Sequence, residues 1–68
     1  MSIKLRQLSY LLSLDEHGSF SRAATALHIS QPALSRSIQG LEAQVGAALF
    51  LREGHGVVPT DLGRVLIE

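Results

Sequence analysis

Residues 19–46 read SFSRAATALHISQPALSRSIQGLEAQVG, and their pattern predicts two short helices joined by a tight turn. The apolar residues of the first helix are Phe20, Ala23, Ala24 and Leu27. Those of the second helix are Leu34, Ile38, Leu41 and Val45. Spacings of three and four residues place each set on one helical face. We therefore expect the two apolar faces to be buried, with His28 and Ile29 as the turn.

The ends of both helices carry recognisable signals. Ser19 and Ser30 stand where an N-cap hydroxyl accepts a hydrogen bond from the backbone. Pro32 is compatible only with the first turn of a helix, where its missing N–H is no loss. Gly46 predicts the end of the second helix.

Further elements are predicted on both sides of this pair. Residues 4–17 predict a helix that ends at Gly18, with an apolar stripe at Leu5, Leu8 and Leu12 widened by Tyr10 and Leu11. Residues 48–51 and 57–58 predict two short strands around a turn at 53–56, and Thr60 predicts the N-cap of a last helix. The predicted fold is mostly α, a winged helix-turn-helix with a three-helix core and a small β-hairpin wing.

The second helix of the pair exposes a small polar face whose residues suit DNA. Gln31, Ser35 and Arg36 can hydrogen-bond base edges in a groove, and such edges are met by the N-terminal part of a recognition helix. No acidic residue occurs from His17 through Leu41. We predict binding to double-stranded DNA. Arg36 would contact a base or a phosphate, and Gln31 would read a base or serve the helix start.

Three other polar residues are candidates for contacts with the phosphate backbone of DNA. Ser19 is expected to cap its helix and can also donate to a phosphate at the helix N-terminus. Arg6 is either solvated or a phosphate contact, and the sequence does not choose between these. Arg52, beside the wing, is the better phosphate candidate.

The bulk composition limits the classes of function. The 68 residues include six basic and six acidic side chains and no cysteine, so the net charge is zero. A domain of this size has little room for a catalytic pocket, and no hydrolase or metal-ligand spacing occurs. We expect no enzyme activity, no cofactor, no metal and no membrane span. Zero net charge predicts weak DNA binding and keeps open a second hypothesis, a protein-interaction module.

The order of these elements resembles the N-terminal winged helix-turn-helix of LysR-type transcriptional regulators. The matching pieces are LRQL at 5–8, GSFSRAA at 18–24, SQPALSRSI at 30–38, LE at 41–42, VG at 45–46, LF at 49–50, Arg52, and GVVPTDLG at 56–63. Each piece is short, but their joint order and spacing are specific and cover nearly the whole chain.

The resemblance implies a bacterial, cytoplasmic and nucleoid-associated regulator. Residues 1–59 would be the DNA-binding domain, and residues 60–68 would begin a truncated linker helix for dimerisation. The full-length protein would be a homodimer or tetramer. A small-molecule effector would bind a C-terminal domain that this chain lacks.

The resemblance also implies roles for individual residues. The helix that follows Ser30 would lie in the major groove, and the wing would reach the adjacent minor groove. Contacts to bases and nearby backbone are implied for Ser30, Gln31, Pro32, Ser35 and Arg36. Arg52 and the wing tip at His55 would lie at phosphates or in the minor groove.

Two departures from the family pattern predict lower affinity. His55 stands at a wing position that is commonly arginine, and a neutral imidazole attracts the minor groove less. Gln39 and Gly40 stand where the family often carries basic residues. Gly40 inside a helix also costs roughly 1 kcal/mol relative to alanine.

Overall fold

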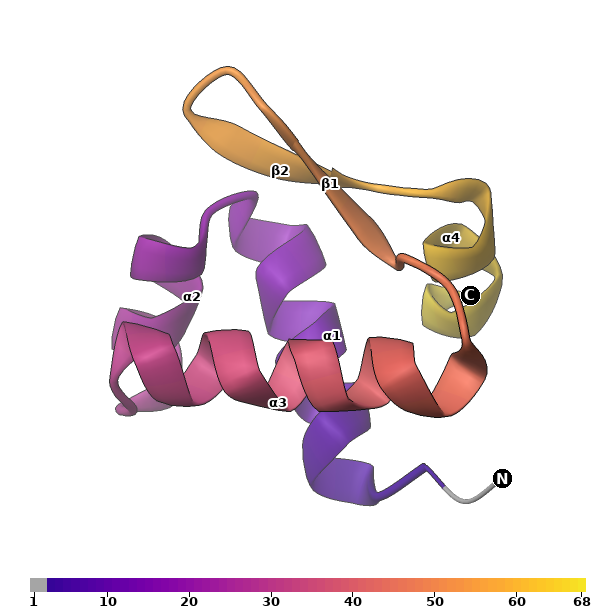
Figure 1. The fold of residues 1–68 in the computed structure, drawn as a ribbon. Coiled ribbons are helices and arrows are strands. Elements are labelled where there is room, and N and C mark those ends of the chain that lie inside the picture. Colours follow the sequence, from indigo (N-terminus) through magenta and orange to yellow (C-terminus); the bar gives the residue numbers. More distant parts are fainter. Residues whose placement is uncertain (1–2) are drawn as a thin grey trace.

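The computed structural model describes residues 3–68. The elements in chain order are α1 (Leu5–His17), α2 (Phe20–Leu27), α3 (Gln31–Val45), β1 (Phe50–Glu53), β2 (Gly56–Pro59) and α4 (Asp61–Ile67). In Figure 1, α3 runs across the front of the molecule and α1 crosses behind it. The antiparallel hairpin β1–β2, called the wing below, extends along one side. This arrangement confirms the predicted winged helix-turn-helix.

The core is built by the three first helices and the wing together. Its buried side chains are Leu11, Leu14, Ala23, Ala24, Leu34, Ile38, Leu41, Leu49, Phe50 and Val57. Full burial of one such large side chain contributes roughly 1.5–3 kcal/mol. Because the wing supplies Phe50 and Val57, it is packed onto the helices and is no free appendage.

The predicted helix ends are confirmed. The Ser19 hydroxyl accepts from the Arg22 amide at 3.3 Å, and the Ser30 hydroxyl accepts from the Ala33 amide at 3.2 Å. The helix-turn-helix turn lies at His28 and Ile29 as predicted, with His28 in the left-handed region at φ 59°. Gly18 and Gly46 end α1 and α3 with positive φ angles of 66° and 80°.

The predicted apolar stripe of α1 is wrong in part. Leu5 is 83% exposed and Leu12 is 43% exposed, whereas Leu11 and Leu14 are fully buried. Leucines occur around most of this helix, so spacing alone does not choose the inner face. The contacts of α1 with α2 and α3 choose it, and they fall on the side of Leu11 and Leu14.

The predicted first strand, 48–51, is also wrong in its bounds. The backbone of Ala48 and Leu49 bonds outside the hairpin: the Leu49 amide donates to Glu42, and Thr60 donates to the carbonyls of both residues. The strand therefore begins at Phe50. The turn shrinks to Gly54 and His55, and Thr60 caps α4 by accepting from the Gly63 amide at 3.0 Å.

Two kinds of feature are missing from the described part of the chain. No helix among residues 3–68 has the length and apolar character needed to cross a membrane. The same residues contain no group of three or more potential metal ligands.

Candidate nucleic-acid interface

The exposed face of α3 carries the polar residues that the sequence singled out. Gln31, Pro32 and Arg36 are exposed, and Ser35 is half-buried. Because a helix turns about 100° per residue, Pro32 and Arg36 lie opposite the buried side of α3, and Ser35 lies at its edge. Gln31 lies near the buried side but is exposed at the first position of the helix. Gln31, Pro32 and Ser35 line one open hollow at the N-terminal end of α3. The first turns of α3 therefore present hydrogen-bonding groups to solvent.

The two capping serines retain hydrogen-bonding capacity. The side-chain oxygens of Ser19 and Ser30 each accept one backbone N–H. A hydroxyl also carries one proton to donate. Each serine can therefore cap its helix and donate to an external acceptor such as a phosphate oxygen. Both caps lie at helix N-termini, where the helix dipole favours negative charge.

The wing places Arg52 and His55 differently. Arg52 lies on β1, and its guanidinium stands 5.1 Å above the centre of the Phe20 ring. His55 is exposed in the two-residue turn at the wing tip. In Figure 1 this tip lies on the same side of the molecule as the N-terminal end of α3. The tip and the polar end of α3 can therefore face one extended ligand.

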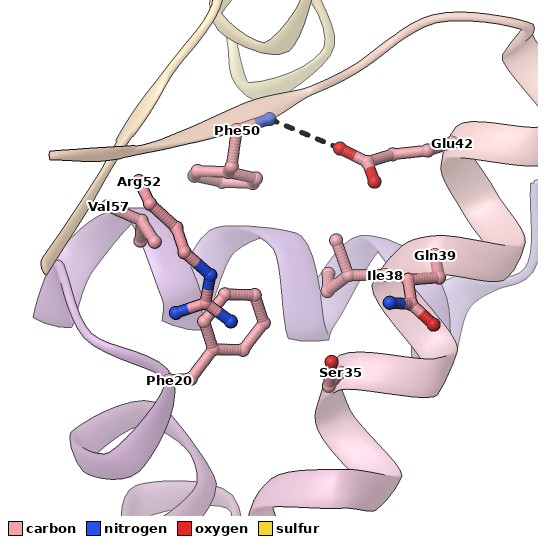
Figure 2. Close-up of a pocket in the computed structure, with 8 residues that line it drawn as sticks. All are labelled: Phe20, Ser35, Ile38, Gln39, Glu42, Phe50, Arg52 and Val57. Carbon is pink, nitrogen blue, oxygen red and sulfur yellow. Dashed lines mark hydrogen bonds between the residues drawn. The ribbon is translucent and has the colours of Figure 1, made fainter.

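A small hollow separates α3 from the wing (Figure 2). Its volume is about 130 Å³, and its lining is Phe20, Ser35, Ile38, Gln39, Glu42, Phe50, Arg52 and Val57. The apolar lining residues belong to the core or its edge. Of the polar ones, Gln39 and Arg52 are exposed, and Ser35 and Glu42 are half-buried. The hollow is thus polar at its opening.

Glu42 is the one carboxylate that lines this hollow, and it accepts hydrogen bonds from backbone amides. Its Oε2 accepts from the Leu49 amide at 2.7 Å and from the Phe50 amide at 3.4 Å. Figure 2 shows the carboxylate on the side of α3 that faces β1. Glu42 therefore ties the start of the wing to α3.

A second tie joins the wing to the α1–α2 loop. The Val57 amide donates to the Gly18 carbonyl at 2.9 Å. A Cβ atom at Gly56 would collide with that same carbonyl, so only glycine lets the strand approach this closely. Together with the Glu42 tie, this bond fixes the wing against α3 and the loop between α1 and α2.

Basic side chains also lie on the other side of α3. Lys4, Arg6, Gln7 and Ser37 line a hollow between the start of α1 and the middle of α3. The Gln7 side-chain amide donates to Gln44 at 3.2 Å, which holds the two helices together there. In Figure 1 the start of α1 and the wing flank α3 from opposite sides. Arg6 and Arg52 are therefore separated by α3 and do not form one cluster.

Lys4 and Ser37 were missed as candidates by the sequence reasoning. The neighbouring Arg6 was found because it belongs to the matching piece at 5–8, and Lys4 lies just outside it. The alternation of basic residues at 4 and 6 was the available signal for Lys4. Ser37 gave no signal, because its proximity to α1 depends on the packing of two helices.

Comparisons with known proteins identify the family. The model of the bacterial regulatory helix-turn-helix proteins of the LysR family matches residues 5–64. This chain belongs to the LysR family. The HTH-type transcriptional regulator TfdT of Cupriavidus pinatubonensis is 46% identical over 66 residues, which are 97% of this chain and 29% of TfdT. The SDS degradation transcriptional activation protein of a Pseudomonas species is 52% identical over 64 residues, or 94% of this chain and 21% of that protein.

Solved structures of the LysR family agree with this assignment. The DNA-binding domain of CbnR in complex with DNA matches with a TM-score of 0.90 and 37% identity, over 96% of this chain and 75% of that one. The DNA-binding domain of BenM on its catB site 1 DNA matches with a TM-score of 0.90 and 40% identity, over 96% and 72%. The chain is thus a DNA-binding domain of a transcriptional regulator. The comparisons do not support the protein-interaction module.

The chain spans about a fifth to a third of the length of these curated relatives. The match therefore concerns the helix-turn-helix domain of the LysR family. It reaches the first half of α4 and stops at Arg64.

Proposed function

We propose that this LysR-family domain reads double-stranded DNA by placing α3 in the major groove and the wing at the adjacent minor groove. The main support is the exposed polar residues at the start of α3. Lys4 and Arg6 lie on one side of this helix, and Arg52 lies on the other. A DNA groove is likewise bordered on each side by a phosphate backbone, so the basic groups can meet phosphates while α3 faces the bases. A helix fits the width of the major groove.

The proposal assigns three kinds of contact. Gln31, Ser35 and Arg36 hydrogen-bond base edges, with Pro32 in apolar contact beside them. Backbone phosphates are bound by Ser19, Ser30, Arg6 and Arg52. His55 enters the minor groove at the wing tip. These roles follow from the exposure of each residue and from its side of α3.

The proposal divides the chain at residue 60. Residues 1–59 form the DNA-binding unit, and residues 60–68 begin a linker helix for dimerisation. Leu62 and Val65 of α4 are exposed, at 38% and 67%, and a partner helix would cover them. The full-length protein would be a homodimer or tetramer with an effector domain for a small molecule. It would act at the nucleoid in the bacterial cytoplasm, without enzyme activity or cofactor.

A backbone NMR titration with an arbitrary duplex at low salt tests the DNA face. No operator is needed, because non-specific binding is dominated by phosphate contacts. We expect amide shifts at residues 30–36 and around His55 that fade as salt rises. Shifts confined to α4, or none at millimolar duplex, would contradict the proposal. A single-stranded DNA of equal charge is the control, since it lacks the grooves.

A further inference from the structure

The alternation of side chains along β1 sends Arg52 toward the helices. Phe50 and Arg52 are two residues apart, so they share one face of the strand. Phe50 is buried in the core at 8% exposure, and Val57 opposite Arg52 in the register is buried at 7%. Arg52 therefore belongs to the inward face of the wing at the edge of the core, although its side chain is exposed.

At this edge the guanidinium meets the first residue of α2. Its Cζ atom lies 5.1 Å from the centre of the Phe20 ring, within the range of a cation–π contact. In Figure 2 the guanidinium overlaps the Phe20 ring, and Ser35 lies to one side of both on α3. Within residues 3–68, Arg52 makes no ion pair with a carboxylate. The Phe20 ring is therefore the charge-stabilising contact that the structure gives Arg52.

Stacking occupies the face of a guanidinium and leaves its edge free. The N–H donors lie in the plane of the group and match the geometry of a phosphate. Here Arg52 lines the hollow between α3 and the wing, whose other polar lining residues are Ser35, Gln39 and Glu42. Glu42 is already bonded to two backbone amides, so it does not compete for Arg52.

We propose that Phe20 is a positioning residue for DNA binding: its ring holds the Arg52 guanidinium at this hollow, where it binds one backbone phosphate. The proposal rests on the proposed DNA-binding function. It adds a role for an apolar residue that the sequence pattern explains by packing alone. Preorganisation is the physical reason, because a long side chain held in its bound conformation loses less entropy when the ligand arrives.

A double-mutant cycle separates positioning from packing. Phe20→Leu keeps an apolar side chain but removes the ring, whereas Phe20→Tyr keeps the ring. Arg52→Gln removes the charge. We expect Phe20→Leu to weaken binding to an arbitrary duplex by about twofold to fivefold, the range of an exposed cation–π contact. Phe20→Tyr should bind like the parent chain. In the Arg52→Gln background, Phe20→Leu should have no further effect.

Two measurements distinguish an effect on DNA binding from an effect on folding. Thermal unfolding of each variant sets a temperature at which all are folded before affinities are compared. The NMR shifts of the Arg52 side-chain protons report the stacking without DNA, since a ring moves them upfield. We expect upfield shifts in the parent chain and in Phe20→Tyr. The parent chain alone gives this result, even if Phe20→Leu fails to fold.

The outcomes are distinguishable. Two results would overturn the positioning role alone. One is Arg52 side-chain protons without an upfield shift in the parent chain. The other is an equal loss of DNA affinity on Phe20→Leu with Arg52 and with Arg52→Gln. A parent chain that does not bind duplex DNA would overturn the proposed function and this inference with it. A normal DNA affinity for Phe20→Leu in a folded protein would also overturn the role.

Discussion

The α2–α3 pair and the wing both carry candidate DNA contacts, but different interactions hold them in place. The pair is defined by local caps and by a shared apolar interface with α1. The wing buries Phe50 and Val57 in the same core, and its position is further set by individual long-range contacts from Glu42, Gly18 and Phe20. A change in the core should therefore unfold the whole domain. A change at one wing contact should move the wing and leave α3 folded.

The largest expected effect is in the shared core. Leu34→Ala removes a fully buried side chain of α3 and should cost about 2–5 kcal/mol of unfolding free energy. This is a large share of the roughly 5–15 kcal/mol typical of a domain. Urea denaturation measures it, with Leu5→Ala at an 83% exposed site as the control. Equal costs for the two variants would contradict the assigned core.

A substitution at Gly56 should displace the wing and leave α3 folded. The added Cβ of Gly56→Ala collides with the Gly18 carbonyl, and we expect a loss of about 1–3 kcal/mol. Amide shifts should change in the wing and the α1–α2 loop, with α3 unchanged. Gly40→Ala is the matched control, since it has open space on a helix and should stabilise the domain by about 0.5–1 kcal/mol.

A substitution at Arg36 should affect recognition without affecting the fold. Arg36 is exposed on α3, and its removal should cost about 1–3 kcal/mol of binding free energy if it reads a base. The measurement is the affinity of Arg36→Ala for a duplex selected by the parent chain. Arg64→Ala, an exposed arginine on α4, controls for net charge. An unchanged affinity for Arg36→Ala would remove Arg36 from the interface.

A smaller effect is expected at the tie between α3 and β1. Glu42→Gln keeps the shape of the side chain but makes it a weaker acceptor for the Leu49 and Phe50 amides. We expect the free energy of unfolding to fall by about 1 kcal/mol. Faster hydrogen exchange of those two amides would show a loosened wing. Glu16→Gln, at an exposed side chain, should change neither stability nor exchange. Unaltered exchange in Glu42→Gln would show that the carboxylate is not the anchor.

The smallest effect should come from the wing tip. His55→Arg adds a permanent charge in the exposed turn, and a contact with a phosphate should add about 0.2–1 kcal/mol to binding. The salt dependence should steepen by about 0.9, the value for one more phosphate neutralised. Ala47→Arg adds the same charge after the end of α3. If both variants gain equally, net charge and not the wing contact is responsible.

The helix-turn-helix pair could be predicted from the sequence because its signals are local. Ser19 and Ser30 cap the helices to which they are adjacent, and apolar spacing sets the inner face of α2 and α3. The position of Arg36 on the exposed face follows from the same spacing, and Gln31 is exposed because it is the first residue of α3. The start of the wing could not be predicted, since Glu42 and Thr60 determine it from a distance.

The sequence by itself determined the order of elements, the helix ends, the turn and the polar face of α3, because each depends on residues within one or two helical turns. Only the tertiary structure decided which leucines of α1 are buried and where the wing begins. It also decided that Arg52 lies over the Phe20 ring and that Lys4 and Ser37 line one hollow. These are contacts between residues far apart in the chain, and their geometry depends on how whole elements pack.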